Sequence, residues 1–343
     1  MTLQKFMQVM RPAVEADLQG FIARSIPERY PELHEMLAYH MGWEGEGAGP
    51  EAQGKRIRPI LVLLAAEAAG GGWQDALPAS TAVELLHNFS LIHDDIQDNS
   101  PLRHNRPTVW KVWGMPQAIN AGDVMFTLSF MAVQGLSGML PAHSVLRASG
   151  ILHETCLLLT QGQYLDISYE HRVDLSIEDY WRMIGGKTSA LLACCAQLGA
   201  LAGGAAEDQI ADFKEFGYSL GLAFQVLDDW LGIWGDMALT GKSAESDLLS
   251  GKKTLPVLRG LSLQGPFAQR WLQGNITAAD VPALARMLDE EGVQAYTLET
   301  AERLTAQALS SLKKATGDQP AQCQAEAAQA LEELTNLLLR RKN

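Results

Sequence analysis

Two clusters of aspartate lie in apolar surroundings, 134 positions apart (228 − 94 = 134) in a chain of 343 residues. The first is Asp94-Asp95-Ile96-Gln97-Asp98, and the second begins with Asp228-Asp229. On a helix, Asp94 and Asp98 are four residues apart, so both carboxylates project from one face. Mg²⁺ prefers hard oxygen ligands and usually completes its coordination with phosphate oxygens of a substrate. The spacing therefore predicts a site in which Mg²⁺ joins aspartates to a diphosphate.

Cationic motifs accompany both clusters. The first cluster follows Gly54-Lys55-Arg56-Ile57-Arg58-Pro59 and precedes Arg103, while the second precedes Thr240-Gly241-Lys242 and Gly251-Lys252-Lys253-Thr254-Leu255-Pro256. This order of motifs, from Gly54 to Pro256, resembles that of the trans-type isoprenyl diphosphate synthases, the polyprenyl synthetase family. The resemblance is closest to the short-chain members that make geranylgeranyl or farnesyl diphosphate.

The resemblance implies a fold, an activity and a cofactor. The fold is an all-α isoprenoid synthase fold, a single large helical bundle around a central cavity that spans residues 1–343 as one domain. The activity is the Mg²⁺-dependent condensation of isopentenyl diphosphate with an allylic prenyl diphosphate, by ionisation, condensation and elimination. The resemblance further implies three Mg²⁺ ions per active site and a homodimer.

The same resemblance assigns roles to individual residues. The metal ligands are Asp94, Asp98 and Asp228, with Asp95 and Asp229 assisting. The allylic diphosphate is bound by Arg103, Lys187, Thr188, Gln225, Lys242 and Lys252. Isopentenyl diphosphate is bound by Lys55, Arg58, His87 and His104. Planar guanidinium groups suit phosphate oxygens and lysine supplies a mobile charge, so these residue types fit an anion pocket.

Two positions depart from the family pattern. Gly232 stands where most relatives carry a third aspartate, and His104 stands where a second arginine commonly follows Arg103. Both changes remove charge, and His104 would bind a phosphate more weakly and with a dependence on pH near its ordinary pKa of about 6.5.

The length of the product should depend on what closes the cavity beneath the first aspartates. Phe89 lies five residues before Asp94, about 7.5 Å along a helix, and Ser90 beside it is small. A ring at Phe89 would stop the growing chain. Within the family, this pairing resembles synthases that make geranylgeranyl diphosphate more than those that make farnesyl diphosphate, so the resemblance favours the twenty-carbon product over the fifteen-carbon one.

Several interpretations stay open. His93 is either a core histidine or a partner of Asp94. Gln163 and Asp166 either orient the site or lie on a plain helix surface. The terminal Arg340-Arg341-Lys342 either closes over a diphosphate or complements a helix dipole. A class I terpene cyclase and a non-catalytic partner subunit are alternative functions. Lys55, Arg58 and the second aspartate pair disfavour the cyclase, and a non-catalytic subunit should have lost metal ligands in both clusters, whereas only Gly232 and His104 depart from the pattern.

Composition sets wider limits. A net charge of −13 and a pI near 5.1 disfavour nucleic acid as a partner. Gly186-Lys187-Thr188 and Gly241-Lys242-Ser243 lack the upstream glycine of a phosphate-binding loop, so ATP hydrolysis is disfavoured. The four cysteines have no metal-binding or disulfide spacing, and the N-terminus has no signal-peptide core, so we expect a cytoplasmic protein.

Apolar residues recur every three or four positions, which predicts helices. The expected helices cover about 55–70, 79–99, 115–137, 145–170, 177–202, 206–234, 294–315 and 320–341. Residues 42–54 and 237–252 are expected to be loops. The uncharged stretch 189–206 is long enough to consider as a membrane span, but its small residues and Gln197 favour a helix buried in the bundle, without stable membrane insertion.

Overall fold

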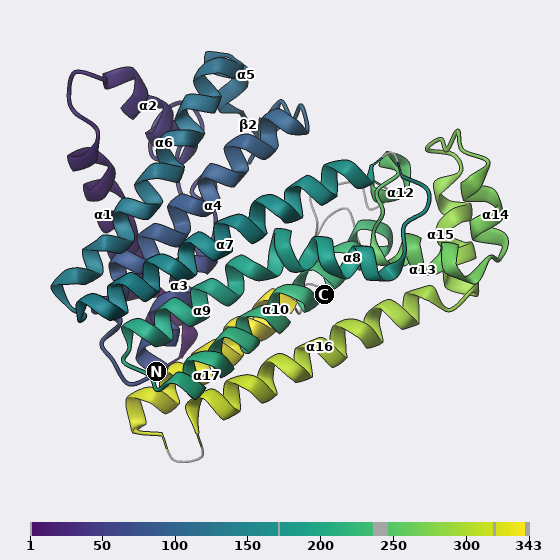
Figure 1. Ribbon diagram of the computed structural model, residues 1–343. Coiled ribbons are helices and arrows are strands. Elements are labelled where there is room, and N and C mark those ends of the chain that lie inside the picture. The colour runs from purple at the N-terminus through teal and green to yellow at the C-terminus, as the bar shows by residue number, and fades with distance from the viewer. Residues whose placement is uncertain (1, 171, 236–245, 318–319, 340–343) are drawn as a thin grey trace. The chain divides into compact units, whose positions relative to one another are not determined.

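The computed structural model describes residues 2–170, 172–235, 246–317 and 320–339. These residues are mostly helical, with one two-stranded hairpin, and the all-α expectation is confirmed (Figure 1). The chain divides into two compact units. Unit 1 comprises residues 1–154, 194–211 and 315–331, and unit 2 comprises residues 155–193, 212–314 and 332–343. The description of residues 1–343 as one domain stays a prediction.

Unit 1 contains the N-terminal helices and the first aspartate cluster. Its elements are α1 (Leu3–Ser25), α2 (Pro31–His40), α3 (Ile57–Ala68), η1 (Trp73–Ala76), α4 (Leu77–Gln97), β1 (Leu102–Arg103), β2 (Arg106–Pro107), α5 (Val109–Trp113), α6 (Met115–Val133) and η2 (Gln134–Gly138). The first part of α7 (Ala142–Tyr169) and most of α9 (Ala190–Ala202) also belong to it.

The core of unit 1 forms around α3, which is apolar over almost its whole length and is buried from Pro59 to Ala66. Glycine lets α9 approach it closely: a Cβ at Gly199 would lie 2.2 Å from the Val62 carbonyl oxygen, and one at Gly203 would lie 2.4 Å from that of Ala66. The uncharged stretch that begins at Ser189 is therefore a core helix, as expected. The segment Ile177–Ala202 is long and apolar enough to cross a membrane, but most of it is buried within the protein.

Unit 2 contains the second aspartate cluster. Its elements are the remainder of α7, α8 (Ile177–Ile184), the π-helical turn η3 (Gly185–Ser189), most of α10 (Glu207–Trp234), α12 (Ser246–Ser250), α13 (Leu255–Leu263), α14 (Pro266–Leu272), α15 (Val281–Glu290), most of α16 (Val293–Thr316) and the end of α17 (Gln322–Leu339). A capping box fixes the start of α8, in which Ser176 and Asp179 exchange hydrogen bonds with each other's backbone amides.

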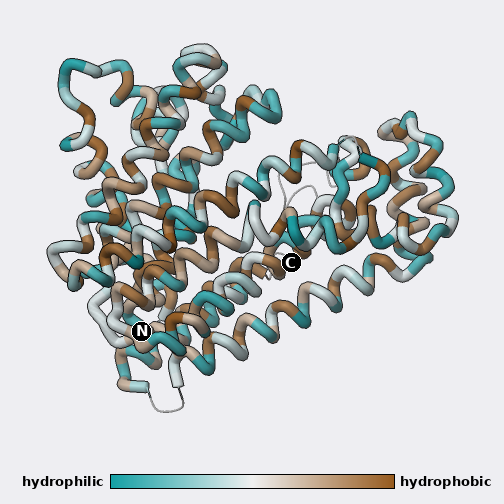
Figure 2. Tube along the Cα trace, in the orientation of Figure 1, coloured by the Kyte–Doolittle hydropathy of each residue, from teal (hydrophilic) through white to brown (hydrophobic). Residues whose placement is uncertain are grey.

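Two hydrophobic clusters stabilise unit 2. One joins Tyr180 and Ile184 of α8 to Val226 of α10 and Leu255 of α13, and the other centres on Phe267 and Leu284. Along α16, hydrophobic and hydrophilic segments alternate in Figure 2, as expected for a helix with one buried face.

The eight expected helices match observed ones, with one difference. The helix expected at 177–202 is interrupted by the π-helical turn η3. Residues 42–54 form a loop, as expected, whereas the second expected loop ends in the short helix α12 and otherwise lies largely outside the described residues. All four cysteines are free, and Cys156, Cys194 and Cys195 are buried.

Candidate active site

The first aspartate cluster lies at the C-terminal end of α4. The helix ends at Gln97, and the backbone N–H of Asp98 donates to the Asp94 carbonyl oxygen at 2.8 Å. Asp94 is half-buried, Asp95 is buried and Asp98 is exposed. A helix C-terminus carries partial negative charge, so carboxylates there are unfavourable without a nearby cation. The local geometry therefore requires positive charge at this end of α4.

Arg103 supplies part of that charge through a bidentate contact with Asp95. Its Nε and Nη2 lie 2.9 and 2.8 Å from the two oxygens Oδ2 and Oδ1. Burial raises the pKa of Asp95, and the Arg103 contact opposes that rise. Arg103 lies in the β-hairpin formed by β1 and β2. The two turn residues of the hairpin, His104 and Asn105, both have positive φ.

Arg58 and His87 form a second cationic contact in unit 1. Arg58 on α3 donates through Nη1 to His87 Nε2 on α4 at 3.0 Å. Burial, and next the Arg58 charge, lower the pKa of His87 well below its ordinary value, so this ring is neutral and accepts the hydrogen bond. The charges of Arg103 and Arg56 lower the pKa of His87 further. Lys55 is exposed at the start of this region.

Neighbouring Arg56 and His104 differ from these groups. Arg56 is buried and pairs with Glu15 at 2.7 Å and Glu84 at 2.8 Å, so it joins α1 to α4. The pKa of His104 is lowered by burial and by the charge of Arg103. His104 thus acts mainly as a neutral hydrogen-bonding group near pH 7, where an arginine would carry charge.

The second cluster contains one buried and one exposed carboxylate. Asp228 is exposed, whereas Asp229 is buried and accepts three hydrogen bonds: from Tyr180 Oη at 2.7 Å, Gln225 Nε2 at 3.0 Å and the Leu255 backbone N–H at 3.1 Å. Burial raises the pKa of Asp229 to about 7, and the three donors oppose the rise. Thr188 Oγ1 donates to Gln225 Oε1 at 2.8 Å, so the network extends to η3.

Lys187 lies in η3, and its ammonium group pairs with Asp166 on α7. Glycine permits the approach, because a Cβ at Gly162 would lie 2.1 Å from the Lys187 backbone nitrogen. Of the two interpretations for Asp166, the structure favours the one in which it orients a site residue. A π-helical turn of this kind is frequently found at functional sites.

The missing aspartate at Gly232 has a structural explanation. A Cβ built on Gly232 would lie 2.0 Å from Asp247 Oδ2, so a carboxylate from α12 occupies the space that a side chain would need. No sequence pattern indicates this contact, because the two residues come together only through the fold. Lys252 is exposed after α12, and Lys242 and Arg340-Arg341-Lys342 lie outside the described residues.

Phe89, Ser90 and His93 lie on α4 beneath the first cluster. The Phe89 ring packs edge-on against His93, with centroids 4.8 Å apart, and tilted against Phe126 of α6 at 4.9 Å. Ser90 Oγ donates to the His87 carbonyl oxygen at 2.8 Å. His93 Nε2 lies 3.4 Å from the Ile119 carbonyl oxygen on α6. His93 therefore packs between helices, which favours its structural interpretation.

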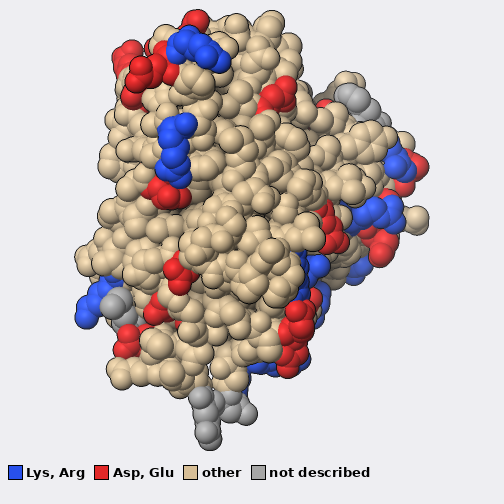
Figure 3. All heavy atoms as spheres, turned by 60° about the vertical axis from the view of Figure 1, so that its left-hand side comes forward, with Lys and Arg blue, Asp and Glu red and all other residues tan. Residues whose placement is uncertain are grey.

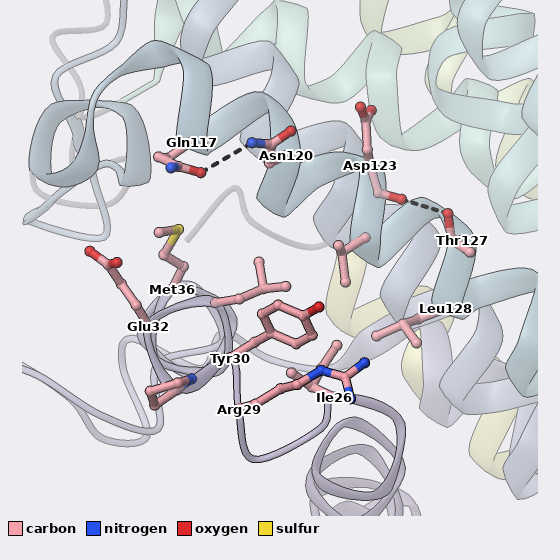
Figure 4. Close-up of a pocket in the computed structure, with 13 residues that line it drawn as sticks. Ile26, Arg29, Tyr30, Glu32, Met36, Gln117, Asn120, Asp123, Thr127 and Leu128 are labelled. Atoms are coloured by element: carbon pink, nitrogen blue, oxygen red, sulfur yellow. Dashed lines mark hydrogen bonds between the residues drawn. The ribbon is translucent and has the colours of Figure 1, made fainter.

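A cavity of about 750 Å³ lies elsewhere in unit 1, between the α1–α2 region and α6. Figure 4 shows Arg29, Tyr30 and Met36 on one side and Asn120 and Asp123 on the other. None of the predicted substrate or metal residues lines it. The predicted metal and substrate residues therefore lie outside the lining of this cavity.

The structure groups the predicted residues within each unit. Unit 1 contains the first aspartate cluster with Lys55, Arg58, His87, Arg103 and His104, and unit 2 contains the second cluster with Lys187, Thr188, Gln225 and Lys252. Among the described residues, no three His, Cys, Asp or Glu side chains are already arranged around a common metal position. A joint site made by both clusters stays a prediction.

Comparison with known proteins decides the family. The polyprenyl synthetase family model matches residues 49–288. The chain belongs to the polyprenyl synthetase family. The match includes every predicted metal, substrate and chain-length residue, from Lys55 to Lys252.

Individual polyprenyl synthetases are similar over most of their length. A geranylgeranyl diphosphate synthase of Mycobacterium tuberculosis is 43% identical over 255 residues, which cover 74% of this chain and 72% of that protein. A (2E,6E)-farnesyl diphosphate synthase of Mycobacterium bovis is 39% identical over 289 residues, covering 81% and 79%. The crystal structure of a polyprenyl synthetase from Streptomyces coelicolor has a TM-score of 0.83 at 35% identity and covers 98% of each chain.

Replacing Tyr180 by Phe should destabilise the protein. The change removes one of three donors to the buried Asp229 and leaves that oxygen less well satisfied, so the free energy of unfolding should fall by about 1–3 kcal/mol. Urea denaturation at pH 7 measures it. Tyr164→Phe is the control, because Tyr164 is 68% exposed and its loss should change stability by less than about 0.5 kcal/mol. Equal stability of the two variants would contradict the role given to Tyr180.

His40 should make stability depend on acid pH. Burial, and next the Arg103 charge, lower its pKa from 6.5 to about 3, and its Nε2 is buried. Below pH 6.5 the unfolded state takes up a proton that the folded state does not. Stability should therefore fall by about 1.4 kcal/mol per pH unit for this group as the pH drops toward 3. In urea denaturation at pH 6.5 and 5, His40→Gln should lose less stability than wild type, whereas a variant of the exposed His143, His143→Gln, should match wild type.

Proposed function

We propose that the chain is a short-chain prenyltransferase that joins isopentenyl diphosphate to an allylic prenyl diphosphate and makes chiefly geranylgeranyl diphosphate. The observation that carries this proposal is the combination, on a polyprenyl synthetase fold, of both aspartate clusters with the Arg58–His87 contact. A terpene cyclase would need no second diphosphate pocket. The runner-up is farnesyl diphosphate as the main product, since relatives of both kinds are similar to this chain.

Mg²⁺ suits the carboxylates of both clusters. Asp94, Asp98 and Asp228 supply hard oxygen donors, and all three are half-buried or exposed rather than buried. Mg²⁺ commonly binds through one or two carboxylates together with substrate phosphates, so carboxylates that are accessible to solvent suit it. In this proposal Asp94, Asp98 and Asp228 would hold three ions that arrive with the substrate, and bound Mg²⁺ would neutralise charge that develops on the leaving diphosphate.

The chain's own residues bind and align the two substrates. Lys55, Arg58 and His87 hold isopentenyl diphosphate, with His104 donating a hydrogen bond. The allylic diphosphate is held by Arg103, Lys187, Thr188, Gln225, Lys242 and Lys252. The allylic C–O bond breaks, the double bond of isopentenyl diphosphate attacks the resulting carbocation, and the released diphosphate takes the proton that leaves the new chain. Alignment by two anion pockets supplies much of the catalysis.

The chain in this proposal works in the cytoplasm as a homodimer. The surface supports an interface in unit 1, because α6 and the start of α7 expose Met115, Ile119, Met131 and Leu146. Figure 3 shows a face of the molecule on which charged side chains are sparse over a wide area. Large apolar surfaces with few charges commonly mark protein interfaces.

The purified protein should elongate allylic diphosphates. The test incubates it with Mg²⁺, labelled isopentenyl diphosphate and each allylic starter, then separates the dephosphorylated alcohols by chromatography. A twenty-carbon alcohol supports the proposal, and a fifteen-carbon alcohol as the end product supports the runner-up. Cyclic hydrocarbons formed without isopentenyl diphosphate, or no conversion by the folded protein alone, would overturn it.

Replacing Phe89 by Ala should lengthen the product. Removal of the ring opens space beneath Asp94 and Asp98, so products beyond twenty carbons should appear while the starter preference is kept. Ser90→Ala is a matched control at the next position and should leave the chain length unchanged, because it removes only a hydroxyl bonded to its own helix. An unchanged product distribution in Phe89→Ala would contradict the proposed floor.

A further inference from the structure

The loop of residues 42–54, which leads into Lys55, contributes few side chains to a hydrophobic core: Ala52 is buried and Trp43 is half-buried. Five glycines, at positions 42, 45, 47, 49 and 54, have positive φ, and most of its other residues are exposed. Such a segment loses much conformational entropy on folding. Its carbonyl oxygens also need donors wherever they are removed from water.

Arg106 supplies donors to the end of α2 and to the first half of this loop. Its guanidinium donates from Nη1 to the Tyr39 carbonyl oxygen at 2.7 Å, from Nη2 to that of Glu44 at 2.6 Å and from Nε to that of Glu46 at 2.9 Å. The group lies 4.0 Å from the centroid of the Tyr39 ring, a cation–π contact. Arg106 is only 7% exposed, so these contacts are shielded from water.

Glycine in the loop is required by this arrangement. A Cβ at Gly45 would lie 2.7 Å from the Tyr39 ring and 3.2 Å from Arg106 Nη2. One at Gly47 would lie 3.3 Å from Arg106 Cγ. The backbone therefore comes closer to the arginine and the ring than a chain with side chains could.

A second arginine holds the end of the loop. Arg11 on α1 donates through Nη2 to the carbonyl oxygen of Gly54 at 3.1 Å and to that of Pro50 at 3.4 Å. Gly54 immediately precedes Lys55. Arg11 thus fixes the peptide from which the lysine side chain extends.

Arg106 also connects the loop to the aspartate cluster. In the hairpin, the backbone of Arg106 lies directly opposite that of Arg103. The Arg103 side chain makes the bidentate contact with Asp95. Tyr39 Oη donates to the Pro107 carbonyl oxygen at 2.8 Å, so the ring fixes the same strand. The loop before Lys55 and the hairpin that carries Arg103 are therefore joined through one buried guanidinium.

We propose that Arg106, assisted by Arg11, is a positioning residue that sets the place of Lys55 relative to Arg103 and thereby the affinity for isopentenyl diphosphate. The inference rests on the proposed function. Neither arginine touches the substrate. Each stabilises a glycine-rich loop that has few buried side chains through directed hydrogen bonds, and the planar guanidinium presents its donors in a fixed fork, whereas lysine has a single flexible point charge.

The test compares Arg106→Lys and Arg106→Gln with wild type and with Arg147→Lys. Arg147 is a matched control because its partner, Glu207, is exposed and far from the loop in sequence. Both Arg106 variants should raise KM for isopentenyl diphosphate about tenfold, with kcat and KM for the allylic substrate changed less than about twofold. Arg147→Lys should match wild type. Should Arg106→Gln fail to fold, Arg106→Lys and Arg11→Lys test the same point.

Hydrogen exchange gives an independent measurement on the substrate-free proteins. Amides of residues 43–54 should exchange about tenfold faster in Arg106→Lys, with the amides of α3 and α4 unchanged. An unchanged KM for isopentenyl diphosphate in folded variants would overturn the proposal, as would a joint change in kcat and both KM values. If the wild-type protein elongates no allylic diphosphate, the proposed function is wrong. Hydrogen exchange then decides whether the arginines order the loop, and unchanged exchange in the variants would overturn that role as well.

Discussion

The desolvation of charge is the constraint on which the arrangement of this protein depends. Its helices are apolar enough to form extensive cores, yet they carry carboxylates and guanidinium groups at buried positions. A buried charge is strongly unfavourable without a partner. Asp95 is therefore matched by Arg103, Asp229 by Tyr180, Gln225 and a backbone N–H, and Arg56 by two glutamates. These pairings fix the helices relative to one another within each unit.

The same constraint separates the aspartates of each cluster by role. In both clusters the second aspartate is buried and held by internal partners, while the first is more exposed. A carboxylate whose oxygens already accept several hydrogen bonds has little capacity left for a cation. The buried members are thus suited to hold the backbone and the cationic residues in place, and the more exposed Asp94, Asp98 and Asp228 are suited to meet an ion that arrives with a diphosphate.

Features that depend on residues close together in the sequence could be predicted, whereas contacts between residues far apart in the sequence could not. The long helices were predictable because their apolar spacing is local, and the aspartate clusters because their residues are adjacent or one turn apart. The Tyr180–Asp229 contact, the position of Asp247 beside Gly232 and the role of Arg106 were not. Each joins residues 15 to 67 positions apart whose proximity depends on packing, and no spacing rule connects them. The turn η3 was missed because a π-helical turn has no separate apolar period.

The electrostatics of unit 1 explain why the geometry of a glycine-rich loop should matter so much. His87 and His104 both have lowered pKa values and add hydrogen bonds rather than charge near neutral pH. Arg103 already shares its charge with Asp95, and Arg56 is neutralised by two glutamates. On the proposed function, most of the remaining positive charge for a second diphosphate comes from Arg58 and Lys55. Arg58 is anchored in α3, whereas Lys55 follows a loop in which few side chains are buried. Lys55, which supplies much of this charge, is thus held in place by Arg106 and Arg11, because these arginines order the backbone before it.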